Sequence, residues 1–245
     1  MPAPALYQDI ADELREHVVR LHPGQRLPAE AELRKTHGAS RFTIRSALQK
    51  LEREGLIFSA QGRGWFVRDQ RPVIWHASAP ETNVRTDISP ADAWSRGIRE
   101  LGREPKEEIT VETVIGPQWT RELLHLEPGE HMLVRRRKRY VDGMFSHTDD
   151  TAFAEPVVRG SPIALPGDVL PGTYAIMEQL GRPWIDPPET TIHARPPSRR
   201  EAELFGLGPG VAMYEVHRVR RTTQGRTVAV TVKLMPGDRN VIVFK

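Results

Sequence analysis

Two groups of arginines have the spacing to bind anions, and the first lies near the N-terminus. Arg41 and Arg45 are four residues apart, with the hydroxyl residues Ser40 and Thr43 beside them. On a helix, residues at this spacing lie on the same face. Guanidinium groups held there could hydrogen-bond to base edges and phosphates. This stretch is therefore a candidate surface for reading double-stranded DNA.

The second group is a run of five cations, Arg135-Arg136-Arg137-Lys138-Arg139. Successive side chains of a strand alternate between its two faces, so a strand would collect Arg135, Arg137 and Arg139 on one face. The planar fork of a guanidinium suits phosphate and carboxylate groups. That face could bind a small anionic molecule. The alternative is a solvated basic face, or one that forms ion pairs with acids on neighbouring strands.

Charge is distributed unevenly along the first part of the chain. Residues 1–33 contain three Lys or Arg and six Asp or Glu, whereas residues 34–68 contain eight Lys or Arg and only two acids. Positive charge concentrated in one segment attracts a polyanion such as DNA. The alternative is an ordinary basic surface, in which Arg41 and Arg45 pair with Glu52 or Glu54.

The elements that must position the first arginines are three helices and a hairpin. An amphipathic pattern predicts a helix over 6–20, and a second short helix should begin near Pro28. Ser40 is placed to cap a third helix that ends at Gly55 and carries Arg41 and Arg45. Two short apolar runs, 56–58 and 65–67, flank a Gly-rich loop and predict a β-hairpin. Three helices followed by a hairpin form a winged helix-turn-helix, whose third helix enters the major groove.

Four motifs in this region resemble the DNA-binding domain of GntR-type bacterial transcription regulators. They are Leu27-Pro28-Ala29-Glu30-x-Glu32-Leu33, Ser40-Arg41-x-Thr43-Ile44-Arg45, Glu54-Gly55-Leu56-Ile57 and Gln61-Gly62-Arg63-Gly64-x-Phe66-Val67. The resemblance implies that Arg41 and Arg45 read guanines and that Ser40 and Thr43 contact phosphates. It also implies that Gln61, Gly62 and Arg63, with Gly64 after them, form the tip of the wing. Many members have a basic residue where this chain has Ala31, so one contact from the second helix is missing.

A second domain is expected after a linker. Hydrophobic periodicity lapses over 70–87, which divides the chain into domains 1–69 and 88–245. Hairpins alternate with helices in the second domain without a βαβ rhythm, which indicates an α+β fold on an antiparallel sheet. The expected strands and helices are listed by residue number: strands 109–115, 132–141, 146–153, 190–195, 211–221 and 227–244, and helices 93–101, 118–125, 173–180 and one from Ser198.

This second half resembles the UTRA effector domain of the HutC subfamily of GntR regulators, a fold similar to chorismate lyase. The resemblance rests on Leu126-x-Pro128-Gly129, Arg137-x-Arg139-x-x-Asp142-Gly143 and Pro171-Gly172-Thr173-Tyr174, among other motifs. It implies that Arg137 and Arg139 bind the anionic group of an effector and that Asp149 accepts hydroxyls. Thr173, at a predicted helix start, and Ser95 complete the candidate site.

The same comparison shows departures from the sugar-phosphate-sensing members. Ala93 and Gly172 stand where small hydroxyl residues are common, and Ala229 and Met235 stand where Glu and Tyr often serve. These changes predict either a less sugar-like ligand or a degenerate pocket.

Several other classes of protein are disfavoured. The composition, 38% hydrophobic and 27% charged, is too apolar for a disordered chain and too polar for a membrane protein. The chain has no cysteine, so it offers no thiolate nucleophile or thiolate metal site. His147 and Asp149 could share a strand face, but a third metal ligand is not evident. We expect no metal, no cofactor, no membrane span and a cytoplasmic location.

The leading hypothesis is a bacterial transcription regulator, not an enzyme. It would be a repressor that binds a palindromic operator in double-stranded DNA as a homodimer and is released by a small, anionic effector. Two alternatives stay open. The C-terminal domain could dimerise without binding an effector, or the chain could be a lyase-like enzyme tethered to DNA, although similarity of fold does not transfer activity.

Overall fold

The computed structural model describes residues 6–60, 62–68, 71–78, 93–207 and 210–244. The chain forms two compact units: residues 1–71 with 198–210, and residues 72–197 with 211–245. Among the described residues, no helix is both long and apolar enough to span a bilayer.

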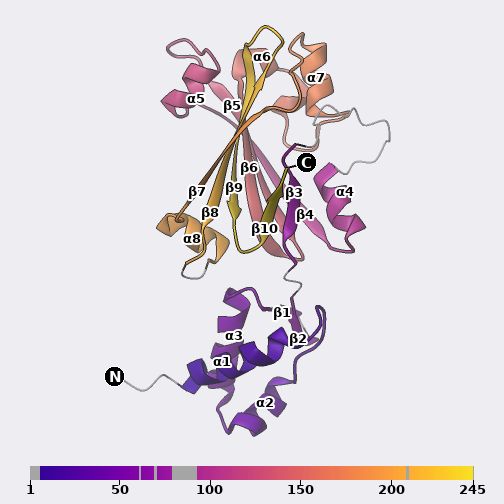
Figure 1. Ribbon diagram of the computed structural model, residues 1–245, viewed down its shortest axis with the longest axis vertical. Helices are drawn as coiled ribbons and strands as arrows, with labels where there is room; N and C mark the ends of the chain where they lie inside the picture. The colour runs from indigo at the N-terminus through magenta and orange to yellow at the C-terminus, as the bar shows by residue number, and fades with distance from the viewer. Residues whose placement is uncertain (1–5, 61, 69–70, 79–92, 208–209, 245) are drawn as a thin grey trace. The chain divides into compact units, whose positions relative to one another are not determined.

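Three helices and a two-stranded hairpin make up the N-terminal part of the first unit (Figure 1). They are α1 (Leu6–Val19), α2 (Glu30–His37), α3 (Arg41–Arg53), β1 (Ile57–Ala60) and β2 (Gly64–Val67). The predicted order of elements is confirmed, but α2 begins two residues after Pro28. Its N-cap is Ala29, which has no side-chain oxygen, and the helix start is held by the backbone N–H of Ala29 donating to Glu32 Oε2 over 2.8 Å.

Local caps fix the start of α3 and the turn before it. Ser40 is the N-cap, and its Oγ accepts a hydrogen bond from the backbone N–H of Thr43 over 3.1 Å. Gly38 ends α2 with φ +58°, a left-handed conformation that favours glycine. The apolar faces of the helices then pack with the hairpin into one core, whose fully buried members include Ala11, Ile44, Ala47, Leu48, Leu51 and Ile57.

A six-stranded antiparallel sheet forms the second unit, in the order β4-β5-β6-β9-β8-β7. Its strands are β4 (Pro105–Val114), β5 (Met132–Val141), β6 (Met144–Ala154), β7 (Glu189–Arg195), β8 (Met213–Arg221) and β9 (Thr227–Pro236). The predicted α+β class with an antiparallel sheet is therefore confirmed, and β5 has the predicted bounds.

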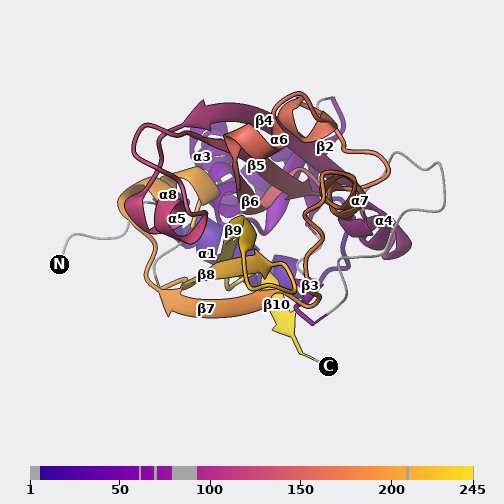
Figure 2. The same cartoon turned by 90° about the horizontal axis from the view of Figure 1, so that it is seen from above.

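Helices cover both faces of this sheet. Those of the second unit are α4 (Ala93–Glu100), α5 (Gln118–Leu123), α6 (Glu155–Val158), the 3-10 turn η1 (Pro162–Ala164) and α7 (Thr173–Gln179). Viewed from its end, the sheet is curved, with α4 and α7 on one side and α5 on the other (Figure 2). Apolar clusters on the two faces include Leu133 with Phe153, and Val134 with Leu124. The remaining helix, α8 (Arg199–Phe205), begins after Ser198 as predicted and has a capping box of Ser198 and Glu201.

The prediction of one last strand over 227–244 is wrong, because the chain forms two strands there. β9 ends at Pro236, and β10 (Asn240–Val243) pairs in parallel with β3 (Val73–His76). A side chain at Gly237 would approach the backbone oxygen of Ala212 to 3.2 Å, which favours glycine at this break. β3 lies within the range predicted for the linker, 70–87, where its run of β-branched and aromatic residues is typical of a strand.

Candidate DNA-binding surface and anion pocket

The first turn of α3 brings four predicted residues together. The side chains of Arg41 and Arg45 are 70% and 55% exposed, so both guanidiniums are available to a macromolecule. The hydroxyl oxygens of Ser40 and Thr43 are 2.8 Å apart at the N-terminus of the helix. Backbone N–H groups at a helix N-terminus also attract phosphate. The surface can therefore hold a phosphate while its arginines reach base edges.

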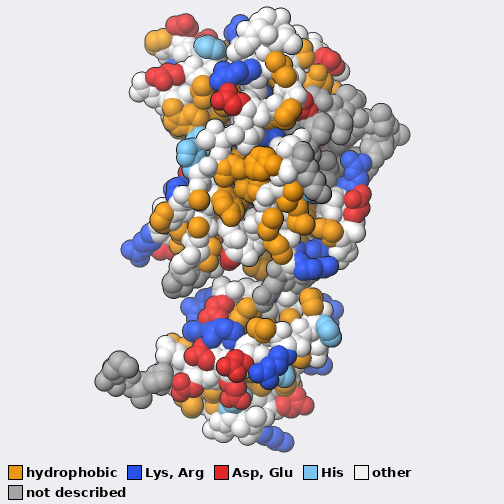
Figure 3. Space-filling model, in the orientation of Figure 1, with side chains coloured by type: hydrophobic (Ala, Val, Ile, Leu, Met, Phe, Trp, Pro, Cys, Tyr) orange, Lys and Arg blue, Asp and Glu red, His pale blue; other side chains and the backbone are white. Residues whose placement is uncertain are grey.

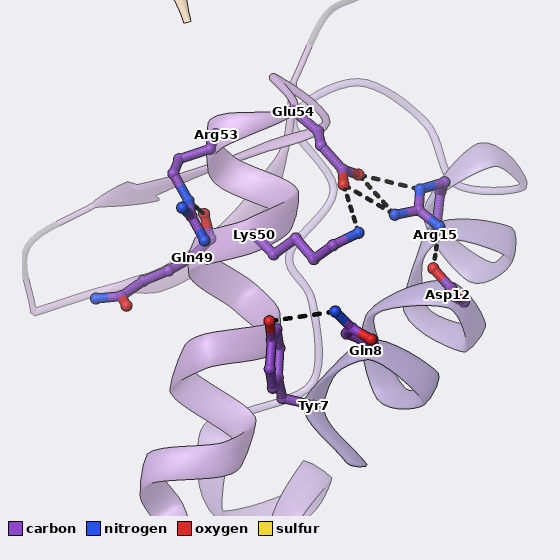
Figure 4. Close-up of polar contacts among 8 residues, drawn as sticks. All are labelled: Tyr7, Gln8, Asp12, Arg15, Gln49, Lys50, Arg53 and Glu54. Carbon is purple, nitrogen blue, oxygen red and sulfur yellow. Dashed lines mark hydrogen bonds and ion pairs between the residues drawn. The ribbon is translucent and has the colours of Figure 1, made fainter. Parts of the chain in front are cut away.

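The alternative pairing of these arginines with Glu52 or Glu54 is wrong. Glu54 accepts hydrogen bonds from both Arg15 and Lys50, each at 2.8 Å in its shortest contact (Figure 4). Partial burial opposes ionisation, but hydrogen bonds from Lys50 and Arg15 outweigh it and lower the pKa of Glu54. Glu52 accepts from the backbone and hydroxyl of Ser59, over 3.0 and 2.9 Å. Both acids are engaged within the fold of the first unit.

Glu30 on α2 is the acid that faces the arginines, a contact that sequence analysis missed. Its carboxylate oxygens lie 3.7 Å from Arg41 Nε and 4.0 Å from Arg45 Nε. The indole N–H of Trp65 donates to Glu30 Oε1 over 3.2 Å, which ties this carboxylate to the base of the hairpin. Glu30 can hold both guanidiniums in place before DNA binds. It belongs to a motif matched in the sequence, but its partners depend on the crossing of α2 and α3.

Phe42 is a second feature that sequence analysis missed. It follows Arg41 on α3 and is 82% exposed, an unusual state for a phenylalanine. An exposed aromatic ring on a helix in the major groove can contact the methyl group of thymine. Phe42 therefore extends the candidate reading surface with an apolar contact.

The wing has the backbone geometry that its glycines predict. Gly62 and Gly64 have φ of +72° and +103°, and the backbone N–H of Arg63 donates to Ala60 across the turn over 2.9 Å. The Arg63 guanidinium carbon lies 6.0 Å from the centre of the Phe66 ring. The remaining predicted wing residue, Gln61, lies outside the described residues.

A cavity of about 530 Å³ lies in the second unit on the sheet face beside α4, α7 and β3. Four predicted ligand residues line it, namely Arg137, Arg139, Asp149 and Thr173. Among the described residues of α4, Trp94 and Arg96 belong to the lining, whereas Ser95 between them does not.

Strand alternation in β5 is confirmed. Arg135, Arg137 and Arg139 all line the cavity, whereas Arg136 forms ion pairs with Glu112 and Asp150 on the opposite face. One face of the strand therefore collects three guanidiniums, as the period of two requires.

Arg135 has a structural role within this group. Its Nη1 donates to the carbonyls of Ile163 and Leu165, each over 2.7 Å, and its Nη2 donates to Gly167. These bonds fasten η1 and the loop after it to the sheet. Burial, with the neighbouring charge of Arg137, lowers the pKa of Arg135 to about 10, so it remains a cation at neutral pH.

Arg137 and Arg139 share a carboxylate that sequence analysis did not identify. Glu107 Oε2 lies 2.9 Å from Arg139 Nε and 3.8 Å from Arg137 Nη1. The guanidinium carbon of Arg139 is also 4.7 Å from the ring centre of Trp94. The side chain of Arg139 is 6% exposed, and Arg137, whose side chain is 17% exposed, is the more accessible of the two.

Asp149 forms an ion pair with Lys233 of β9, a residue that the sequence did not single out. Burial opposes ionisation of Asp149, but the charges of Lys233 and Arg139 lower its pKa below the usual range. Burial lowers the pKa of Lys233 to about 8, although the charge of Asp149 opposes this shift. The pair therefore places a carboxylate and an ammonium group in the middle of the cavity floor.

Two further cations come from β8. The guanidinium carbon of Arg218 lies 5.1 Å from the ring centre of Trp75, and that of Arg220 lies 5.5 Å from Trp184. Arg220 Nη1 also donates to Thr231 Oγ1 over 2.6 Å. Burial, with the charge of Arg220, lowers the pKa of Arg218 to about 9. Alternation in the sequence Arg218-Val219-Arg220 was a signal that could have placed both arginines on one face.

Within the described parts of the chain, no group of three His, Asp or Glu residues is arranged to hold a metal ion. His147 lines the cavity, but its Nδ1 lies 3.1 Å from Ser146 Oγ, and Asp149 is paired with Lys233.

Two known sequence families match successive parts of the chain. Residues 6–67 match the family described as bacterial regulatory proteins, gntR family, and residues 100–240 match the UTRA domain.

Relatives along the whole chain are regulators. The chain is 31% identical over 228 residues to the HTH-type transcriptional regulator Rv0792c of Mycobacterium tuberculosis, covering 91% of this chain and 79% of the relative. It is 28% identical over 220 residues to MngR of Escherichia coli, the mannosyl-D-glycerate transport/metabolism system repressor, covering 89% and 80%.

The fold is similar to that of PhnF from Mycobacterium smegmatis, with a TM-score of 0.55, 19% identity, and coverage of 96% of this chain and 98% of PhnF. The two named relatives in sequence, MngR and Rv0792c, are transcription regulators and not enzymes. With a winged helix that presents Arg41 and Arg45 and a C-terminal UTRA domain, the chain belongs to the GntR family of DNA-binding transcription regulators.

Proposed function

We propose that this regulator is a repressor that a small anionic molecule releases from its operator. The observation that carries the proposal is the charge of the cavity in the second unit. Seven cationic side chains are among the described residues that line it, against the two carboxylates of Asp149 and Asp168. Guanidinium and ammonium groups in such excess suit a phosphate or carboxylate ligand. The relative MngR is named a repressor, which supports repression rather than activation.

DNA recognition is assigned to α3 and the wing. Arg41 and Arg45 would read guanines, Ser40 and Thr43 would contact phosphates, and Arg63 would lie along the backbone or minor groove. The exposure of both α3 arginines and their position at the start of the helix support this assignment.

The operator is proposed to be palindromic, with a homodimer bound to it. One winged helix covers only a half-site, and two-fold DNA sites are matched by two-fold proteins. Exposed apolar side chains on and next to the β3–β10 pair supply a surface for association, and they include Ile74, Val241 and Phe244. Figure 3 shows hydrophobic side chains gathered over this part of the second unit. Light scattering of the full chain at tens of micromolar tests the dimer, and a strict monomer would contradict it.

For the effector to release DNA, it must bind more tightly to a conformation of the dimer in which the two α3 helices no longer fit successive major grooves. A difference of roughly 1–3 kcal/mol between the two conformations changes operator occupancy about 5–150-fold. The cavity and the reading helix need no direct contact for this linkage.

The test is a thermal-shift screen of the full chain with phosphorylated and carboxylated metabolites, followed by DNA-release assays with the compounds that bind. Arg137→Ala should abolish binding, whereas Lys138→Ala, on the opposite face of the same strand, should bind normally. Compounds that bind Arg137→Ala as tightly as the parent would place the anion site elsewhere. If no anion binds, the cations are structural and the second unit dimerises without an effector.

A further inference from the structure

Four of the seven cations that line the cavity form two clusters on separate strands. Arg137 and Arg139 lie on β5, and Arg218 and Arg220 lie on β8. We propose that the effector carries two anionic groups, one bound by Arg137 and the other by Arg218 and Arg220. This inference rests on the proposed function and specifies the chemical class of its ligand.

The sheet register separates the clusters. β5 and β8 are three strand spacings apart, in the order β5-β6-β9-β8. Neighbouring strands are about 4.8 Å apart, so the backbones of the two strands are separated by roughly 14 Å. Long arginine side chains narrow this distance at the cavity. The two clusters therefore lie on opposite sides of the cavity floor, which favours a ligand with an anionic group at each end.

An ion pair occupies the floor between them. Arg137, Asp149 and Lys233 are successive partners across β5, β6 and β9. Because Asp149 and Lys233 largely neutralise one another, the excess positive charge lies on the two sides of the floor. A ligand with one anionic group would neutralise one side only. A ligand with two would match both sides across the middle.

The β8 cluster is also held in a geometry suited to binding. The guanidinium of Arg218 lies over the Trp75 ring and that of Arg220 over the Trp184 ring, and both arginines are at least nine-tenths buried. Burial and these cation–π contacts restrict the side chains, so less freedom is lost when they bind an oxyanion. Because folding has already removed water from these groups, an incoming anion meets donors that are desolvated and preorganised.

Isothermal calorimetry on the full chain with matched ligand pairs tests the proposal. The pairs are fructose 6-phosphate with fructose 1,6-bisphosphate, and glycerol 3-phosphate with 3-phosphoglycerate. Within each pair the member with two anionic groups should bind about tenfold or more tightly, as expected for one further charge-assisted contact.

Substitutions then assign each anionic group to a cluster. Arg218→Gln should remove the preference for the member with two anionic groups, whereas Arg137→Gln should weaken binding of both members. Arg221→Gln, at the end of β8 and outside the cavity lining, is the matched control and should keep the preference. Arg220→Gln provides a second variant if Arg218→Gln does not fold.

The outcomes separate this inference from the proposed function. Equal affinities within both pairs, or a full preference retained in both the Arg218 and Arg220 variants, would overturn the second anionic group while leaving a single-anion effector in place. Failure of every member of both pairs to bind at millimolar concentration would overturn both proposals.

Discussion

The arginines of α3 and those of the cavity differ in their contact with water. Arg41 and Arg45 have side chains 70% and 55% exposed, whereas Arg139 is 5% and Arg218 2% exposed. An exposed guanidinium keeps its hydration until DNA arrives, so its effect falls on binding and depends on salt. A buried guanidinium loses its hydration during folding, so its hydrogen bonds become part of the stability of the domain. Arginine therefore serves recognition in the first unit, and it serves both stability and recognition in the second.

The largest expected effect is loss of a buried arginine. Arg135→Ala would leave the carbonyls of Ile163, Leu165 and Gly167 without their guanidinium donor. We expect the free energy of unfolding of the second unit to fall by about 3 kcal/mol, measured by urea denaturation. Arg136→Ala, half-exposed on the opposite face, should cost less than about 1 kcal/mol. Equal losses would contradict the contrast between buried and exposed arginines.

Removing an exposed arginine should affect DNA and not folding. Arg45→Ala is expected to weaken operator binding by roughly 1–3 kcal/mol and to relax base preference, with little change in melting temperature. Arg63→Ala should weaken matched and scrambled duplexes more evenly, because the wing contacts the backbone. Fluorescence anisotropy on both duplexes measures this. If Arg45→Ala weakens both duplexes equally, its role is phosphate contact rather than base reading.

The affinity of the cavity for anions should depend on pH, whereas DNA binding by the arginines of α3 should not. Lys233, whose pKa burial lowers to about 8, is protonated below that pH and loses its charge above it. Anion affinity should therefore be highest below pH 8 and fall about tenfold towards pH 9, as a bound anion favours the protonated form. Calorimetry at pH 7 and 9 tests this, with Lys233→Met expected to bind weakly and to lose less affinity than the parent between the two, because only Arg218, whose pKa is about 9, still loses part of its charge there. An affinity that rises with pH in the parent would contradict the role of Lys233.

The smallest expected effect concerns the ion-pair network of the first unit. Glu54→Gln should lower the free energy of unfolding by about 1 kcal/mol at pH 7, because the hydrogen bonds from Arg15 and Lys50 lose their charged acceptor. Folding lowers the pKa of Glu54, so its contribution is complete above its unfolded pKa and is lost as pH falls. The variant should therefore lose less stability than the parent on acidification to pH 4. Glu16→Gln, in an exposed pair with Arg20, is the control and should behave like the parent.

Sequence reasoning succeeded where the determining contacts are local. The Ser40 cap, the spacing of Arg41 and Arg45, and the alternation of Arg135, Arg137 and Arg139 all follow from residues within a few positions of one another. The family resemblance added Asp149 and Thr173, which line the cavity.

The residues it missed depend on pairing between distant strands. Glu107 reaches Arg139 because β4 pairs with β5 in one register, and Lys233 reaches Asp149 because β9 pairs with β6. A shift of one residue would turn either side chain to the opposite face. The division of 227–244 into two strands likewise depends on β3, more than 160 residues earlier, as the partner of β10.

The pairing of β3 with β10 also affects the order in which the parts of the protein can fold during synthesis. Val73 pairs with Asn240, so β3 leaves the ribosome long before its partner exists. At roughly 5–20 residues per second, the delay is about 10–30 s. The described core of the winged helix, in contrast, uses no residue after Val67. The DNA-reading helix can therefore be packed while Trp75 still lacks the strand that holds it in the cavity wall. A chain that stops short of Asn240 would keep the means to read DNA but could not complete the pocket proposed to control it.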